Sequence, residues 1–294
     1  MAQIFRKNNY WLGKFNCMAS PCEVFVNAEP KAHAIKIIEL AESEALRIEK
    51  KFSRYTTNNI VYRINNAKGK TLSVDEETAL LLDYADQCYQ MSDGLFDITA
   101  GVLRKAWQFD GSDKIPNPLD IKQVFQHIGW QKVKWEKPYL TLNPGMEIDF
   151  GGIGKEYAVD RAANLIRQKY SDFTLVNFGG DMAAVGTKNI KKPWEIGLQD
   201  PNNMESGLIA KIELSHGAVA TSGDAHRFLL KNGRRYSHIL NPKTGWPIEN
   251  PPKQVTVMAP TCIEAGMLAT FAILQGSEAE SFLAAQDVEY RIIY

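Results

Sequence analysis

The chain has 294 residues, 45% hydrophobic and 23% charged, as expected for a globular protein with a sizeable core. Its 34 basic and 34 acidic side chains give a formal net charge of +0, which excludes a strong overall field for nucleic acid or anionic lipid. No stretch has the apolar length of a membrane span or signal peptide, so we expect a cytoplasmic protein. The four scattered cysteines lack CxxC or zinc spacing and predict free thiols.

The first half of the chain predicts mainly helices. After a strand over residues 22–27, Pro30 opens a helical pattern that runs to about Lys51. Its expected buried positions recur at helical spacing, at Ile35, Ile38, Ala41, Ala45 and Ile48. Polar residues 57–59 precede a short apolar turn, and Ser73 with Glu76 predicts a capping box for the next long helix, whose apolar positions are Leu80, Leu81, Tyr84 and Cys88.

The second half predicts mainly strands. A short helix in LDIKQVFQHIGW and two strands, over residues 133–135 and 139–142, lead to a series of strands from Thr174 onwards. Asn232 and Gly233 indicate a tight hairpin between two of them. A strand, two helices and a closing strand end the chain. Helices followed by runs of strands favour an α+β fold, with a mixed or antiparallel sheet and packed helices.

The segment over residues 149–160, DFGGIGKEYAVD, predicts a strand, a glycine-rich turn and a helix start. Glycines at 151, 152 and 154 allow close backbone approach, and the helix N-terminus would direct N–H groups and its positive dipole end at a phosphate. The spacing matches neither a dinucleotide GxGxxG nor a P-loop. We interpret the segment as an anion site for a nucleotide; a tight connection without ligand is the alternative.

Further polar and glycine-rich clusters stand at expected element ends: SDGLFD, VNFGGD, ATSGDAHR and SHILNPKTGWP. In this order, together with FSRY, RIN, WEIGLQDP and EAGMLAT, they resemble the ApbE family of flavin transferases, from Met18 to about Thr270. The resemblance implies one ApbE-like, T-fold-related α+β domain over residues 1–294, or two closely packed subdomains. It also implies that the protein takes FAD and attaches FMN to a threonine or serine of an acceptor flavoprotein.

The resemblance implies a set of flavin contacts spread along the chain. The positions that match them are Met18, Tyr55, Leu95, Phe96, Asp97, Gly151, Tyr157 and Leu240. The FAD site is thus expected to combine the glycine turn with the SDGLFD and SHILNP segments.

The resemblance also implies Mg²⁺, a hard cation that stabilises phosphate charge as AMP leaves. Its expected ligands are Gly154 on the turn, and Ala269 and Thr270 on a later helix. The family carboxylate four residues before Thr270 is replaced by Gly266.

Glu156 stands where the family usually has glycine, and we hypothesise that it replaces the missing metal ligand. Glu264 is a less favourable candidate, because its place on its helix directs it elsewhere. A solvated first-turn glutamate is the alternative interpretation of Glu156.

The acceptor hydroxyl needs a base, for which His238 is favoured because imidazole titrates near neutrality. Asp181 and Asp224 are the alternatives. Lys155 and Arg227 would neutralise pyrophosphate charge. The expected function is an FAD:protein FMN transferase. A binding protein that holds FAD without transfer, and a pyrophosphatase that gives FMN and AMP, remain as alternatives.

Overall fold

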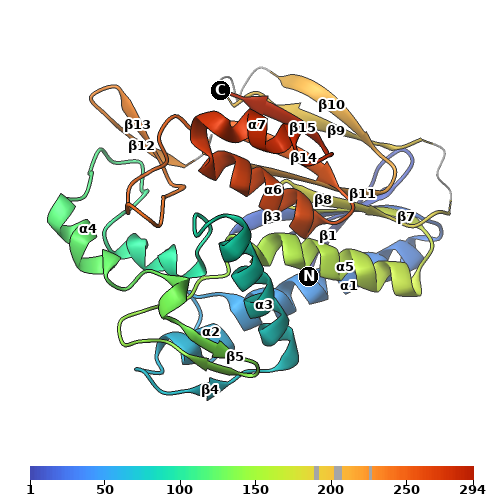
Figure 1. Cartoon of the computed structure of the whole chain (residues 1–294). Coiled ribbons are helices and arrows are strands. Elements are labelled where there is room, and N and C mark those ends of the chain that lie inside the picture. Colours follow the sequence, from blue (N-terminus) through green and yellow to red (C-terminus); the bar gives the residue numbers. More distant parts are fainter. Residues whose placement is uncertain (189–191, 202–206, 225–226) are drawn as a thin grey trace.

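The computed structural model describes residues 1–188, 192–201, 207–224 and 227–294. Its centre is one eight-stranded sheet in the order β1-β2-β3-β7-β8-β11-β14-β15, antiparallel at every pairing (Figure 1). These strands span Gln3–Arg6, Trp11–Cys17, Ser20–Asn27, Phe173–Phe178, Asp181–Val185, Gly217–Gly223, Gln254–Ala259 and Glu289–Ile293. The expected α+β class is confirmed, and of the two sheet types expected the antiparallel one is present.

Three smaller sheets accompany the large one. They pair β9 with β10, β12 with β13, and β6 with both β4 and β5. Their strands are Leu72–Ser73 (β4), Lys134–Glu136 (β5), Tyr139–Thr141 (β6), Trp194–Gln199 (β9), Leu208–Leu214 (β10), Phe228–Lys231 (β12) and Arg234–Ser237 (β13). The hairpin predicted at Asn232 and Gly233 joins β12 to β13, and both residues have the positive φ that a type I′ turn requires.

The helices follow the sequence prediction closely in number and order. The α-helices are Lys31–Phe52 (α1), Ile60–Asn65 (α2), Glu76–Met91 (α3), Pro118–Phe125 (α4), Gly154–Lys169 (α5), Cys262–Leu274 (α6) and Ala279–Ala284 (α7). Three 3₁₀ segments span Ile98–Lys105 (η1), Trp130–Lys132 (η2) and Gly276–Glu278 (η3).

Three local predictions are wrong. The residue that caps α3 is Asp75, whose carboxylate accepts from Thr78 N, because Ser73 belongs to β4 instead. On α1 four of the five predicted positions are buried, but Ile35 is only partly buried because the buried face passes through Ala34 and Ile37 instead. The residues before the glycine turn form no strand, although Asp149 N donates to Ile98 O at 2.8 Å.

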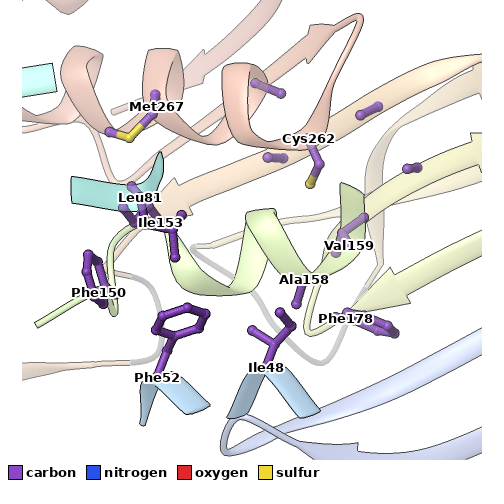
Figure 2. Packing of buried hydrophobic residues seen from close by; sticks show 14 of the residues in the cluster. Ile48, Phe52, Leu81, Phe150, Ile153, Ala158, Val159, Phe178, Cys262 and Met267 are labelled. Carbon is purple, nitrogen blue, oxygen red and sulfur yellow. The ribbon is translucent and has the colours of Figure 1, made fainter. Parts of the chain in front are cut away.

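Helix α5 lies between α1 and α6, and all three cover one face of the large sheet (Figures 1 and 2). Ile48 and Phe52 of α1 pack on one side of α5, and Met267 of α6 lies on the other (Figure 2). A separate cluster with Phe173, Ile196 and Val219 joins the β9–β10 hairpin to the opposite face of the sheet. The glycine turn at the start of α5 is therefore held by a buried helix, so its position is set by the core.

Within the described residues, no helix has the length and apolar character needed to cross a membrane. All four cysteines are buried and free, which confirms the prediction of free thiols.

Candidate functional site

The glycine turn folds tightly onto the start of α5. Ile153 N and Gly154 N both donate to Phe150 O, at 2.9 and 2.7 Å. Asp149 accepts from Gly151 N at 2.9 Å and pairs with Arg54 at 2.5 Å, which anchors the turn to the end of α1. The N-cap residue of α5 is Ile153, which has no polar side chain for capping. The start of α5 thus has no side-chain cap, as an anion site would require, although Gly154 N is already bonded to Phe150 O.

Phe96 of the SDGLFD segment lies against this turn. A Cβ added to Gly152 would come within 2.9 Å of Phe96 Cε2, so the backbone at Gly152 approaches the ring as closely as glycine allows. Phe96 is buried and also meets Phe271 of α6, with 6.2 Å between ring centroids. The structure therefore brings together the SDGLFD segment, the glycine turn and α6, as the sequence predicted.

Lys155 and Asp181 form an ion pair beside the turn, with 2.7 Å between Nζ and Oδ2. Asp181 begins β8 and only 2% of its surface is exposed. Burial lowers the pKa of Lys155, but attraction to Asp181 and Glu156 outweighs it and the net pKa is raised. Burial raises the pKa of Asp181 despite this partner. The GKEY and GGD segments are thus joined by an ion pair whose carboxylate is buried and whose lysine is partly exposed.

The Glu156 side chain occupies the space opposite Gly266 of α6. A Cβ added to Gly266 would lie 2.5 Å from Glu156 Cγ and 3.1 Å from Oε1. Burial and the nearby Asp181 raise the pKa of Glu156 to about 8, although Lys155 opposes this. Glu156 is therefore not the solvated glutamate of the alternative interpretation.

The helix α6 supplies the remaining predicted metal ligands. Thr270 Oγ1 donates to Ser222 Oγ of β11 at 3.4 Å, and Ala269 is fully buried. In the part of the chain that the structure describes, no group of three or more histidine, cysteine, aspartate or glutamate side chains is arranged to hold a metal ion. A cation here would depend on one carboxylate, hydroxyl and carbonyl groups, and its substrate.

Asp160 fixes the relative position of α5 and α6, a role that the sequence analysis missed. Its carboxylate accepts from Cys262 N and Ile263 N, both at 2.8 Å, so a side chain of α5 caps the first turn of α6. Asp160 closes the DFGGIGKEYAVD segment, but its partner helix lies about a hundred residues further on, so no local signal identifies this contact.

Among the predicted flavin contacts, Met18 and Tyr55 lie near the end of α1. Met18 occupies the tight β2–β3 turn with a φ of 52°, and its N–H donates to Glu49 at 2.7 Å. Tyr55 is 81% exposed, and the Arg54 guanidinium lies 5.2 Å from its ring centroid. Gly151 is likewise exposed on the turn. Tyr55 and Gly151 leave surface that a ligand could cover.

Two further predicted contacts are engaged within the protein. Asp97 caps η1, accepting from Thr99 N at 2.8 Å and from Trp130 N at 3.0 Å. The Tyr157 hydroxyl donates to Glu77 at 2.9 Å, which directs it toward α3. Leu95 is partly buried against the main core. The structure thus gives Asp97 and Tyr157 clear structural contacts, while their contact with flavin stays a prediction.

His238 and Leu240 follow β13. His238 Nδ1 donates to Arg227 O at 2.9 Å, which leaves Nε2 as the basic nitrogen of the neutral ring. Burial lowers the pKa of His238 below its ordinary value of 6.5. Leu240 packs in a second cluster around Trp107 of the segment after η1. A neutral imidazole with a free nitrogen is the state that a general base requires.

The alternative base Asp224 is already paired. Its buried carboxylate lies 2.9 Å from Arg235 and accepts hydrogen bonds from that guanidinium. Arg227 is exposed at the same bend. Ala225 and His226 of the ATSGDAHR segment lie outside the described residues.

The model of the ApbE family matches residues 18–292. The chain belongs to the ApbE family. This membership accounts for the order of the glycine-rich clusters that the sequence analysis assembled.

Relatives of named activity align with most of the chain. The chain is 28% identical over 267 residues to the FAD:protein FMN transferase of Klebsiella pneumoniae, covering 89% of this chain and 81% of the relative. It is 30% identical over 263 residues to the enzyme of that name in Chlamydia pneumoniae, covering 87% and 81%.

Solved ApbE structures share the fold. The ApbE protein of Thermotoga maritima superposes with a TM-score of 0.86 at 31% identity, covering 96% of this chain and 94% of that one. The flavin transferase ApbE of Vibrio cholerae gives 0.84 at 23% identity, covering 99% and 94%, which supports the fold alone.

Proposed function

We propose that this ApbE-family protein is an FAD:protein FMN transferase, which cleaves FAD and attaches FMN through a phosphoester bond to a threonine or serine of an acceptor flavoprotein. The observation that carries the proposal is the family match over residues 18–292, together with relatives of this activity that align with most of the chain. The glycine turn, which no side chain caps, and the partly buried Lys155 beside it fit a diphosphate ligand.

His238 and Lys155 can each be given a role in phosphoryl transfer. The acceptor oxygen attacks the phosphorus of the FMN half, the bond from that phosphorus to the bridging oxygen breaks, and AMP leaves with that oxygen. His238 Nε2 would take the hydroxyl proton, because Nδ1 is held by Arg227 O. Lys155, held by Asp181, would face developing negative charge.

A divalent cation fits the donors near the turn. Glu156 Oε2 is enclosed and has no hydrogen-bond partner within the described residues, and an enclosed carboxylate oxygen of this kind suits a hard cation. Gly154, Ala269 and Thr270 are the other proposed ligands. Bound Mg²⁺ would stabilise charge on the phosphate oxygens.

The decisive experiment is incubation of the protein with FAD, Mg²⁺ and an unflavinylated, threonine-bearing acceptor flavoprotein. We expect the acceptor to gain the mass of a phosphoester-linked FMN and in-gel flavin fluorescence, with AMP released in equal amount. An acceptor variant with valine at the target threonine is the control. Free FMN with AMP would instead identify a pyrophosphatase, and intact FAD a binding protein.

The cytoplasmic location stays a prediction from the sequence. It favours a soluble acceptor, and a flavoprotein of the flavin reductase type is the acceptor class we expect.

A further inference from the structure

The Glu156 side chain of α5 fills the space that a side chain at position 266 of α6 would need. The 2.5 Å between a Cβ at position 266 and Glu156 Cγ is shorter than any tolerated contact, so a side chain at 266 and the present Glu156 conformation exclude one another. The glycine on α6 is therefore what allows the glutamate on α5 to point between the two helices.

One oxygen of the Glu156 carboxylate lacks a partner. Oε2 is enclosed without a hydrogen bond within the described residues, and Lys155, whose charge acts on Glu156, is already paired with Asp181 at 2.7 Å. Once Glu156 is ionised, the +1 of Lys155 faces −1 on each of Asp181 and Glu156, so the three side chains carry −1 together. An enclosed carboxylate in this position is costly unless a cation joins it.

The surroundings suit Mg²⁺ in particular. Mg²⁺ is usually held by one or two carboxylates, with substrate phosphates and water completing its shell, so a cluster of three acidic side chains is not needed. Gly154 begins the helix that carries Glu156, and Thr270 stands one turn after Gly266 on the same face of α6. The two helices that meet at Glu156 and Gly266 therefore also carry the proposed hydroxyl and carbonyl ligands.

We propose that Glu156, projecting from α5 into the space left by Gly266, is the carboxylate ligand of the divalent cation that binds together with FAD. This inference rests on the proposed function for the identity of the diphosphate. Its structural consequence is that positions 156 and 266 form an exchangeable pair, in which a glutamate on α5 with glycine on α6 is equivalent to a glycine on α5 with aspartate on α6.

The test measures metal binding directly. Mn²⁺, which prefers the same oxygen ligands, is titrated into the protein with FAD and no acceptor, and free Mn²⁺ is followed by electron paramagnetic resonance. We expect Glu156→Gln to weaken Mn²⁺ binding by at least about tenfold, as loss of a ligand charge should. Glu264→Gln, an exposed glutamate in the first turn of α6, is the matched control and should bind as the wild type does.

The exchanged pair gives a second, independent readout. Gly266→Asp alone should lose stability and metal binding, because its Cβ meets Glu156, whereas Glu156→Gly with Gly266→Asp should recover Mn²⁺ binding. Unchanged Mn²⁺ affinity in Glu156→Gln would overturn the inference. If Glu156→Gln does not fold, as judged by circular dichroism, the double variant decides: recovered binding supports the inference and lost binding overturns it.

The transferase function and the metal-ligand role of Glu156 can be refuted independently of each other. A wild type that binds Mn²⁺ with FAD through Glu156 but never labels an acceptor would refute the transferase function alone. A wild type that labels the acceptor, with Mn²⁺ binding unaffected by Glu156→Gln, would refute the metal inference alone.

Discussion

At the scale of single residues, Lys155 combines an ion pair with Asp181 and the proposed role of facing phosphate charge. Lys155→Met would leave the buried Asp181 carboxylate unpaired, and breaking such a pair typically costs about 3 kcal/mol of stability. We therefore expect a lower urea midpoint and strongly reduced FMN transfer.

A double variant separates these effects. Lys155→Met with Asp181→Asn removes both charges, so it should regain much of the stability in urea unfolding but none of the transfer. Full transfer by the double variant would show that the Lys155 charge has no part in the reaction.

The pKa of His238 leads to a prediction about how the rate of FMN transfer depends on pH. Because burial lowers the pKa of His238 below 6.5, its neutral, proton-accepting form is the dominant one at neutral pH. The kcat/KM for FMN transfer should rise as pH increases through a value below 6.5 and then stay level. His238→Ala should remove this limb and slow transfer by about 10²-fold or more.

Two measurements distinguish a base from a structural histidine. FAD affinity should be retained in His238→Ala, and His216→Ala, at an exposed histidine between β10 and β11, should leave the profile unaltered. An acidic limb that persists in His238→Ala would assign the base to another residue.

At the scale of elements, the placement of α5 against α6 determines whether Glu156 and Thr270 can act on one ligand. Asp160 caps α6 from α5 through two 2.8 Å hydrogen bonds. Asp160→Ala should lower stability by about 1 kcal/mol, as loss of a helix cap does, and should also weaken Mn²⁺ binding with FAD.

Thr261→Ala is the comparison for this helix. Thr261 is the residue directly before α6 and caps it by accepting from Glu264 N at 3.4 Å. Its loss should therefore reduce stability without separating α5 from α6. Equal effects of the two variants on Mn²⁺ binding would contradict a positioning role for Asp160.

At the scale of the whole molecule, Glu77 of α3 links three helices. It pairs with Arg47 and Lys51 of α1 and accepts from Tyr157 of α5. Burial alone would raise the pKa of Glu77, but these hydrogen bonds lower it to about 2.

This network predicts how stability changes in acid. Since the folded pKa lies below the ordinary 4.5, the stabilisation is present above pH 4.5 and is lost as pH falls toward 2. Glu77→Gln should therefore lower Tm at pH 7 and differ less from the wild type as pH approaches 2. A Tm difference that stays constant over this range would mean that Glu77 ionisation does not support the helix layer.

Short segments of the sequence predicted much of the secondary structure and the family of this protein. The order of helices and strands, the Asn232–Gly233 hairpin and the ApbE family all follow from residues close together in sequence, because turn chemistry and hydrophobic periodicity act over a few positions. Local preference failed where a neighbouring element competed for the same residue, as when Ser73 paired in β4 instead of capping α3.

Only the tertiary structure decided which polar groups share a space. The Lys155–Asp181 pair, the capping of α6 by Asp160 and the contact of Glu156 with Gly266 join residues from separate segments, and each depends on how α5 packs between α6 and the sheet. Sequence indicates which side chains could do chemistry. Burial and distance, which arise only when the helices pack, determine which of them are paired and which are left for a ligand.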